Sequence, residues 1–207
     1  MSYIDQIAFH MGRRDEVPNQ ELAAILAEKE DLGGIKEIAS YLNDKNKSIQ
    51  SDCLKVLYET GYIKPELIVS FGDTFFYHLN SRNNRMVWGS MIAIATIAEL
   101  VPGKMMDNLD LLLNKIDKGT TITHVWGIYT LINTCKGGDS YKKKLFPLLL
   151  SYLKECRPID FAKRVESILI ITEKKELPLI SSIIEDKKDS LSDTQYKRAV
   201  KAIKKYQ

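Results

Sequence analysis

The chain has 207 residues, 44% of them hydrophobic and 28% charged, so it is long enough and apolar enough for one soluble domain with a full core. Its few Gly and Pro residues argue against a β-sandwich, a barrel or a disordered chain, and its apolar runs are too short to span a bilayer, which takes ~20 residues. The net charge is only +3, but residues 1–135 carry 13 Lys and Arg against 17 Asp and Glu, whereas residues 136–207 carry 17 against 10.

The first predicted element is an N-terminal helix pair over residues 2–31. A helix over 2–13 faces a second one over 19–30, and Pro18 separates the two. The glycines Gly33-Gly34 then predict a break in helical structure. We therefore expect the N-terminal pair to end just before residue 33.

Three hairpins follow, each with a first or A helix, a polar turn and a second or B helix. Gly61 stands where a glycine ends the first B helix, and Pro102-Gly103 end the second. The predicted A helices cover 35–42, 65–79 and 105–116, and the predicted B helices cover 48–60, 86–100 and 120–135.

A fourth hairpin is predicted at 141–153 and 158–172, and a shorter last pair covers 177–205. Pro147 falls inside the fourth A helix and is expected to kink it. Ser192 and Gln195 have the spacing of a capping box at the start of the final helix. The Lys-rich outer face of this pair suits the end of a stack, because no neighbour covers it there.

Apolar residues recur through these hairpins at a step of 37 residues, or 38 and then 37 in the B helices. Within each row the spacing i, i+3, i+4, i+7 is the apolar stripe of one helix. The sequence therefore predicts an all-α fold, an α–α superhelix of about five antiparallel helix pairs that form a single domain over residues 1–207. Three of the columns are Ile38, Phe75, Leu112 and Leu149; Leu42, Leu79, Ile116 and Leu153; and Val56, Ile94, Ile132 and Leu169.

Paired helices at this step resemble HEAT repeats, with armadillo repeats as the near relation. The likeness covers residues 33–173 well and the two ends loosely. Pro147 is a feature of HEAT A helices, and Asp44 and Asp160 with Arg164 come nearest to the Asp and Arg positions of that family. The resemblance implies a right-handed solenoid whose B helices line a long concave face for a peptide, another subunit or nucleic acid.

Trp88 and Trp126 are the only Trp residues, and they lie 38 residues apart in matching positions of neighbouring B helices. One interpretation is a stacking platform for a peptide side chain or a base. The other, which the sequence favours, is packing between repeats, with the glycine after each Trp letting the helices approach. A large Trp side chain is seldom wholly buried, so a partly open edge is compatible with both.

Cationic and imidazole side chains stand near the two Trp residues or in the next B helix. Together they could form a polar strip that grips a carboxylate or a phosphate. Taken singly, each is more typical of a solvated turn. The five candidates are Arg82, Arg85, His124, Lys163 and Arg164.

We expect non-catalytic binding of a macromolecule, a protein or peptide, on the concave B-helix face near the two Trp residues. The alternative is nucleic acid bound through basic residues 136–207. The resemblance extends this alternative to the chemistry of the alkylpurine DNA glycosylases, which are built from HEAT-like repeats. That chemistry uses a carboxylate beside aromatic side chains, and only Asp52 and Glu166 stand mid-helix near this face. The sequence therefore gives little support for an enzyme.

The remaining sequence features predict few special sites. Three isolated cysteines and the lack of a secretion signal favour reduced thiols in a cytoplasmic protein without membrane insertion. No ligand spacing joins His10, His78 and His124 to one another or to a cysteine, and no nucleotide-binding glycine motif occurs. We therefore expect no metal and no cofactor.

Overall fold

The computed structural model describes residues 2–206, and within that range it contains twelve α-helices and no strand, which confirms the all-α prediction. The chain divides into two compact units, unit 1 (Met1–Asn133) and unit 2 (Thr134–Gln207). The prediction of a single domain stays a prediction. None of the helices in residues 2–206 combines the length and the apolarity needed to cross a lipid bilayer.

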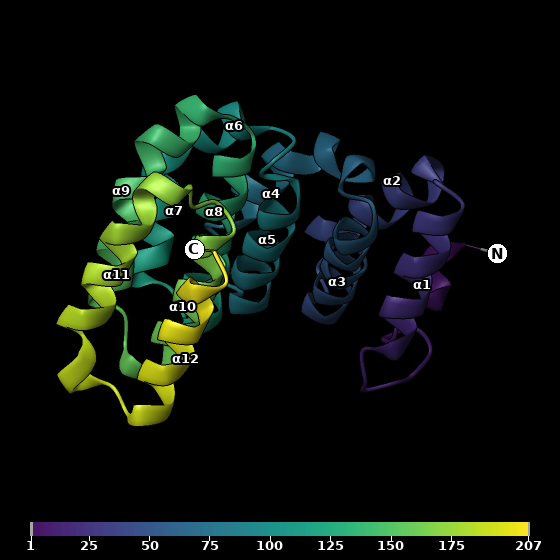
Figure 1. The fold of residues 1–207 in the computed structure, drawn as a ribbon. Helices are drawn as coiled ribbons and strands as arrows, with labels where there is room; N and C mark the ends of the chain where they lie inside the picture. Colours follow the sequence, from purple (N-terminus) through teal and green to yellow (C-terminus); the bar gives the residue numbers. More distant parts are fainter. Residues whose placement is uncertain (1, 207) are drawn as a thin grey trace. The chain divides into compact units, whose positions relative to one another are not determined.

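Unit 1 starts with a short 3-10 helix, Tyr3–Gln6, and then builds two layers of α-helix (Figure 1). Further 3-10 turns, at Tyr41–Asn43, Pro65–Leu67 and Val69–Phe71, extend the A layer. The A layer consists of α2 (Leu32–Ser40), α4 (Gly72–His78), α6 (Pro102–Asp107) and α7 (Leu109–Lys118), and the B layer of α1 (Val17–Glu28), α3 (Lys47–Ile63), α5 (Asn84–Ile97) and most of α8 (Thr121–Lys136).

The B helices of unit 1 lie side by side. Helix α3 packs between α1 and α5, and α8 continues the row, because the side-chain amide of Asn133 donates a hydrogen bond to the carbonyl of Ala95 (2.9 Å). Two A helices pack on the B helix that follows them: α2 on α3 and α4 on α5. Unit 1 is therefore a row of helical hairpins, as the sequence predicts.

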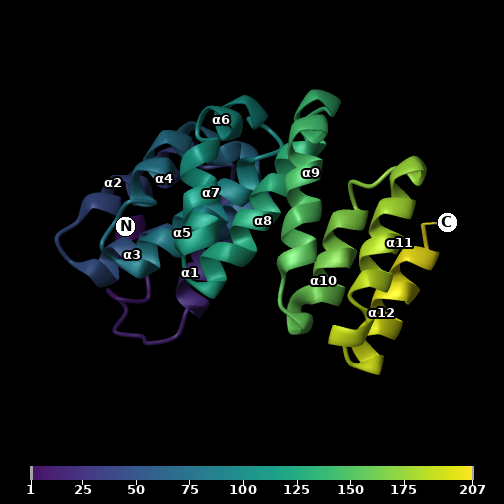
Figure 2. The ribbon, with the colours of Figure 1, turned by 90° about the vertical axis from the view of Figure 1, so that its left-hand side faces the viewer.

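Unit 2 contains two further hairpins, which Figure 2 shows as adjacent helices. Helix α10 packs against both α9 and α12, and α11 packs against α9 and α12. The capping box is confirmed, because the Ser192 hydroxyl accepts from the Gln195 amide (3.3 Å) and the Gln195 side chain accepts from the Ser192 amide (2.9 Å). The four helices are α9 (Asp139–Glu155), α10 (Pro158–Leu169), α11 (Leu177–Asp186) and α12 (Asp193–Lys204).

The repeated columns occupy the core of each unit. Ile38, Phe75 and Leu112 in unit 1 and Leu149 in unit 2 all have no exposed surface. The columns through Leu42 and through Val56 are likewise buried at every member. The predicted repeat of helical hairpins is therefore confirmed.

The predicted helix over 2–13 is wrong. Only residues 3–6 form a 3-10 helix. Beyond them the backbone makes isolated turn hydrogen bonds, such as Met11 amide to Ile7 carbonyl, and two of its amides donate to distant side chains. The Ala8 amide donates to the side-chain oxygen of Asn19 (2.9 Å), and the Phe9 amide donates to the Asp52 carboxylate (2.8 Å). Gly12, at φ +67°, then turns the chain in the left-handed conformation that glycine tolerates.

The predicted breaks at Gly33-Gly34 and at Gly61 are also wrong. Gly33 and Gly34 lie in the first turn of α2, where the Asp31 side chain caps the helix by accepting from the Gly34 amide (2.8 Å). Gly61 lies inside α3, where an added Cβ would clash with Thr96. Pro102 begins α6, as proline does in many first turns.

Candidate functional site

Trp88 and Trp126 lie on α5 and α8 of unit 1. Both are partly buried and pack against the hydrophobic core, so each indole has a packing role and retains some exposed surface. A Cβ on Gly89 would lie 2.7 Å from Leu54 Cδ2, and one on Gly127 would overlap Ile116. The glycine after each Trp therefore does allow neighbouring helices to approach closely.

The two indoles belong to a series of rings that we call the aromatic cluster, formed by Tyr58, Tyr62, Trp88, Trp126 and Tyr129. Tyr58 lies between Trp88 and Tyr62, with ring centroids 6.3 Å and 5.9 Å away. Tyr62 in turn lies 5.7 Å from Trp126, which lies 5.3 Å from Tyr129. The cluster thus joins α3, α5 and α8 across the B layer of unit 1.

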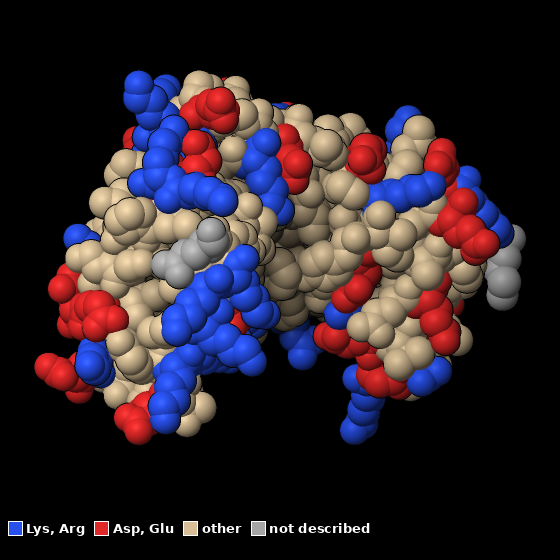
Figure 3. Space-filling view, viewed as in Figure 1, with Lys and Arg blue, Asp and Glu red and all other residues tan. Residues whose placement is uncertain are grey.

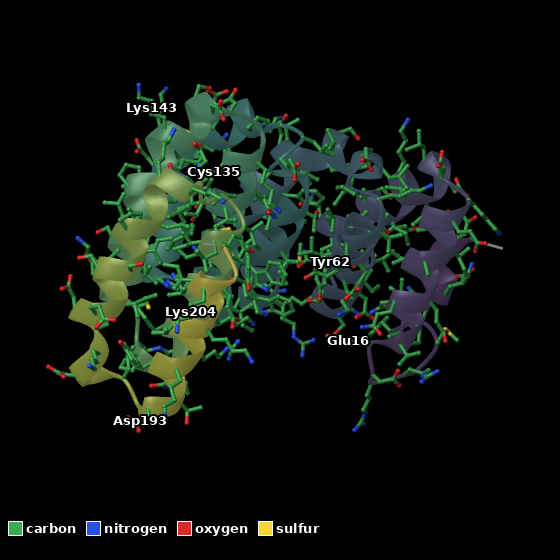
Figure 4. All side chains as sticks on the ribbon, in the orientation of Figure 1. Glu16, Tyr62, Cys135, Lys143, Asp193 and Lys204 are labelled. Atoms are coloured by element: carbon green, nitrogen blue, oxygen red, sulfur yellow. The ribbon has the colours of Figure 1, made fainter. Side chains whose placement is uncertain are left out.

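The open part of the aromatic cluster is Tyr62. Its side chain is 45% exposed, whereas Tyr58, one helical turn before it, is buried (Figure 4 labels Tyr62). Burial raises the pKa of the Tyr58 phenol to about 12 and also raises the pKa of Tyr62. Both phenols are therefore neutral near pH 7, and Tyr62 offers solvent an aromatic ring with a hydroxyl donor.

A charged group flanks the cluster on the side of α1. The Lys55 amine lies 2.7 Å from Glu16 and 2.8 Å from Glu59, and 5.0 Å from the centre of the Tyr58 ring. Burial lowers the pKa of Lys55, but its hydrogen bonds to the two carboxylates outweigh burial and raise that pKa above the ordinary value. Lys55 is therefore charged, and two carboxylates face its single positive charge.

Next to this group lies a small cavity of about 110 Å³. Glu16, Asp52, Lys55, Arg85 and Trp88 are among the residues that line it. With Glu59 included, three carboxylates stand against two cations, so the charge around the cavity is −1. This part of unit 1 can therefore accept an apolar or cationic side chain beside an aromatic ring.

The structure places the five residues of the predicted polar strip in different environments. Arg82 and Arg85 are exposed on the turn before α5 and in its first turn, and only Arg85 lies at the cavity with Trp88. The His124 ring contacts the Ile116 carbonyl at the end of α7 (3.0 Å), so it links two helices. Lys163 is exposed on α10 of unit 2, whereas Arg164 is only 6% exposed. A joint binding role for these five residues stays a prediction.

Sequence reasoning missed the tyrosines of the cluster and Glu16. Tyr62 lies beyond the predicted end of its helix at residue 60, because a glycine at position 61 predicts a helix stop, whereas α3 continues to Ile63. Tyr58 and Tyr62 stand one turn apart, and Tyr129 follows Trp126 by almost one turn, so a scan for aromatic pairs at helical spacing could have found them. Glu16 carries no sequence signal, since α1 and α3 bring it to Lys55.

The two carboxylates considered for base-excision chemistry already have partners. Asp52 accepts from the Phe9 amide (2.8 Å), and Glu166 holds Arg198 through two hydrogen bonds (2.8 and 2.6 Å). In the part of the chain that the structure describes, no three His, Cys, Asp or Glu side chains are grouped as a metal site would require.

No family model matches the chain, and no curated protein does. Among solved structures, a designed armadillo repeat protein in complex with the peptide (KR)4 is similar, with a TM-score of 0.64 at 13% identity over 99% of this chain and 98% of that one. An engineered protein has a TM-score of 0.62 at 16% identity over 99% and 98%, and a second engineered protein 0.59 at 15% over 98% and 58%. The chain has the fold of an armadillo- and HEAT-like helical solenoid.

Proposed function

We propose that this solenoid is a non-catalytic binding protein that holds an extended, basic segment of a partner protein on the B-helix face of unit 1. The observation that carries the proposal is the aromatic cluster, whose rings come from three successive B helices and whose open member is Tyr62. The cytoplasmic location expected from the sequence belongs to the same proposal.

The spacing of the B helices suits an extended peptide. Packed helices lie about 8–10 Å apart, and an extended chain advances ~3.3 Å per residue, so every third peptide residue would meet a new helix. The rings of Tyr62 and Trp126, 5.7 Å apart, would together contact one side chain of such a peptide. Large aromatic side chains of this kind often supply most of the binding energy at an interface.

The charge of unit 1 favours Lys and Arg in the partner. Residues 1–135 have four more acidic than basic residues, and Glu16 and Glu59 both stand beside the cluster. A cation over an exposed aromatic face is attracted by the ring, and nearby carboxylates add to that attraction. The peptide in the similar designed protein, (KR)4, has this chemistry.

The test is fluorescence anisotropy with a labelled (KR)4 peptide and a labelled acidic peptide of equal length. We expect binding of the basic peptide only, and about a tenfold loss of affinity for Tyr62→Ala. Tyr62 is the best variant because its ring is half exposed, so its removal disturbs the core less than removal of Trp126. Tyr77→Ala is the matched control, since Tyr77 is 70% exposed on the A layer, outside the cluster.

Three results would count against the proposal: equal binding of the acidic peptide, no binding of the basic one, or the same loss in Tyr77→Ala. Circular dichroism of each variant shows whether the helices are intact. An oligonucleotide that displaced the basic peptide, with a steep salt dependence and with the same loss in Tyr62→Ala, would instead support nucleic acid as the ligand of this face.

A further inference from the structure

The positive charge of unit 2 gathers on its last helix. Lys197, Lys201 and Lys205 follow one another at intervals of four residues on α12 and just after it, and all three are exposed. Figure 3 shows Lys and Arg side chains together over α12. Four residues of helix rise about 6 Å, so these amines form a row on one side of the helix. Cations in the last turn of a helix suit its dipole, but like charges at this spacing repel one another, so helix stability alone does not explain the row.

A cavity of about 350 Å³ lies beside this row. Leu169 and Ala202, both buried, provide apolar surface within it, and Tyr206, 40% exposed, adds an aromatic ring. Lys201 and Lys205 also line it. The cavity thus combines apolar surface, an aromatic ring and positive charge.

One carboxylate lines the same cavity, and it is already engaged. Glu166 accepts two hydrogen bonds from Arg198, and these chiefly lower the pKa of Glu166, with smaller contributions from Lys205 and Lys163. Within residues 2–206, Lys163, Lys201 and Lys205 have no carboxylate within ion-pair distance. We call Lys163, Lys201, Lys205 and Tyr206 the basic surface.

We propose that the basic surface binds single-stranded nucleic acid. One base would enter the cavity and stack on Tyr206, while Lys163, Lys201 and Lys205 would contact phosphates on either side of it. Stacking on an aromatic ring beside a positively charged track is how sequence-tolerant single-strand sites work. Acidic side chains or a lipid head group would satisfy the lysines, but neither of these groups is itself a flat ring that stacks on Tyr206.

The test is anisotropy of a labelled 12-nucleotide oligothymidylate with the full chain, titrated between 50 and 200 mM NaCl. Three phosphate contacts predict a slope of about −2 for log affinity against log salt. Lys201→Glu with Lys205→Glu should weaken binding at least tenfold and bring the slope to about −0.7, the value for one remaining contact. The matched control is Lys143→Glu with Lys144→Glu, which changes the charge equally at two exposed lysines of α9.

Stacking has its own test at Tyr206. Tyr206→Ala should weaken oligothymidylate binding about tenfold without changing the salt slope, and Tyr206→Phe should keep the affinity. Tyr62→Ala should leave oligothymidylate binding unchanged, so this proposal and the peptide proposal can fail separately.

Four outcomes would overturn the proposal. The first is an equal loss in the Lys143/Lys144 control, and the second is unchanged binding in Tyr206→Ala. The third is equally tight binding of a poly-glutamate peptide, which would indicate an acidic protein partner. The fourth is binding to phosphatidylserine vesicles with no binding of the oligonucleotide, which would indicate a membrane surface.

Discussion

Gly89 and Gly127 control how closely single helices of unit 1 approach their neighbours. The nearest atom to a Cβ on Gly89 would be the mobile end of Leu54, whereas a Cβ on Gly127 would meet Ile116 at Cγ1, close to the backbone. A leucine tip can turn aside, but a β-branched side chain in a helix has essentially one rotamer. The two sites should therefore respond differently to the same added methyl group.

Gly127→Ala is expected to lower the free energy of unfolding. Overpacking costs about 1–3 kcal/mol, and the better helix propensity of alanine returns about 1 kcal/mol, so a net loss of about 1 kcal/mol is expected. Urea unfolding followed by circular dichroism measures it. Gly89→Ala serves as the comparison and should lose less, so a larger loss at Gly89 would contradict this account.

Lys142 is a buried cation held by carboxylates within unit 2. Its amine lies 2.7 Å from Glu173 and 2.8 Å from Glu176. Hydrogen bonds from Lys142 and then Lys175 lower the pKa of Glu173 from 4.5 to about 2. Because the folded pKa lies below the unfolded one, the stabilisation is present above pH 4.5 and is lost as the pH falls towards 2.

Lys142→Met should remove much of this acid sensitivity. Without the amine, the pKa of Glu173 returns towards its ordinary value, so the difference in stability between pH 5 and pH 2.5 should shrink relative to the parent chain. Urea midpoints at the two pH values measure that difference. Lys144→Met, at an exposed position of the same helix, is the control and should keep the parent dependence.

Residue patterns predicted part of the candidate site. The matching positions of Trp88 and Trp126 follow from the repeat alone, and the structure places both on the B layer. Tyr62 joins the cluster because α3 extends past Gly61 to Ile63. Thr96 of α5 packs closely against Gly61. A contact between residues 35 apart in sequence leaves no local signal, so the open member of the cluster was missed.

At the scale of the element, the N-terminal segment shows how side chains can replace a helix. Its apolar residues have helical spacing, which predicted a helix over 2–13. Asn19 and Asp52 accept the Ala8 and Phe9 amides from 11 and 43 residues away, so these backbone donors are satisfied without a helix. The spacing of apolar residues indicates which residues are buried, but it does not indicate which acceptor a backbone amide bonds to.

Asn19→Ala is expected to loosen this segment. The Ala8 amide and Asn19 are both buried, so the substitution leaves a donor without an acceptor at a cost of about 1–3 kcal/mol. Hydrogen exchange at the Ala8 amide should accelerate, and the urea midpoint should fall. Asn114→Ala, at an exposed position of α7, is the control, and equal effects in the two variants would argue against a specific anchor.

At the scale of the whole molecule, the repeat is what the sequence predicted best. A solenoid buries the same helix positions in every hairpin, so one column of apolar residues reports one environment several times. Phe75, Leu112 and Leu149 share no local sequence, yet all three are fully buried. Glycines marked boundaries less well, because Gly34 and Gly61 serve close packing and not chain breaks.

The opposite charges of the two units have a consequence in dilute solution. The Debye length is about 10 Å at 0.1 M ionic strength and about 30 Å at 0.01 M. At the lower ionic strength the acidic unit of one copy therefore attracts the basic unit of another copy over a longer distance. The second virial coefficient should thus be lowest in dilute buffer and rise on adding sodium chloride, opposite to the behaviour of a colloid with uniform charge. Purification in low-salt buffer would then favour reversible self-association.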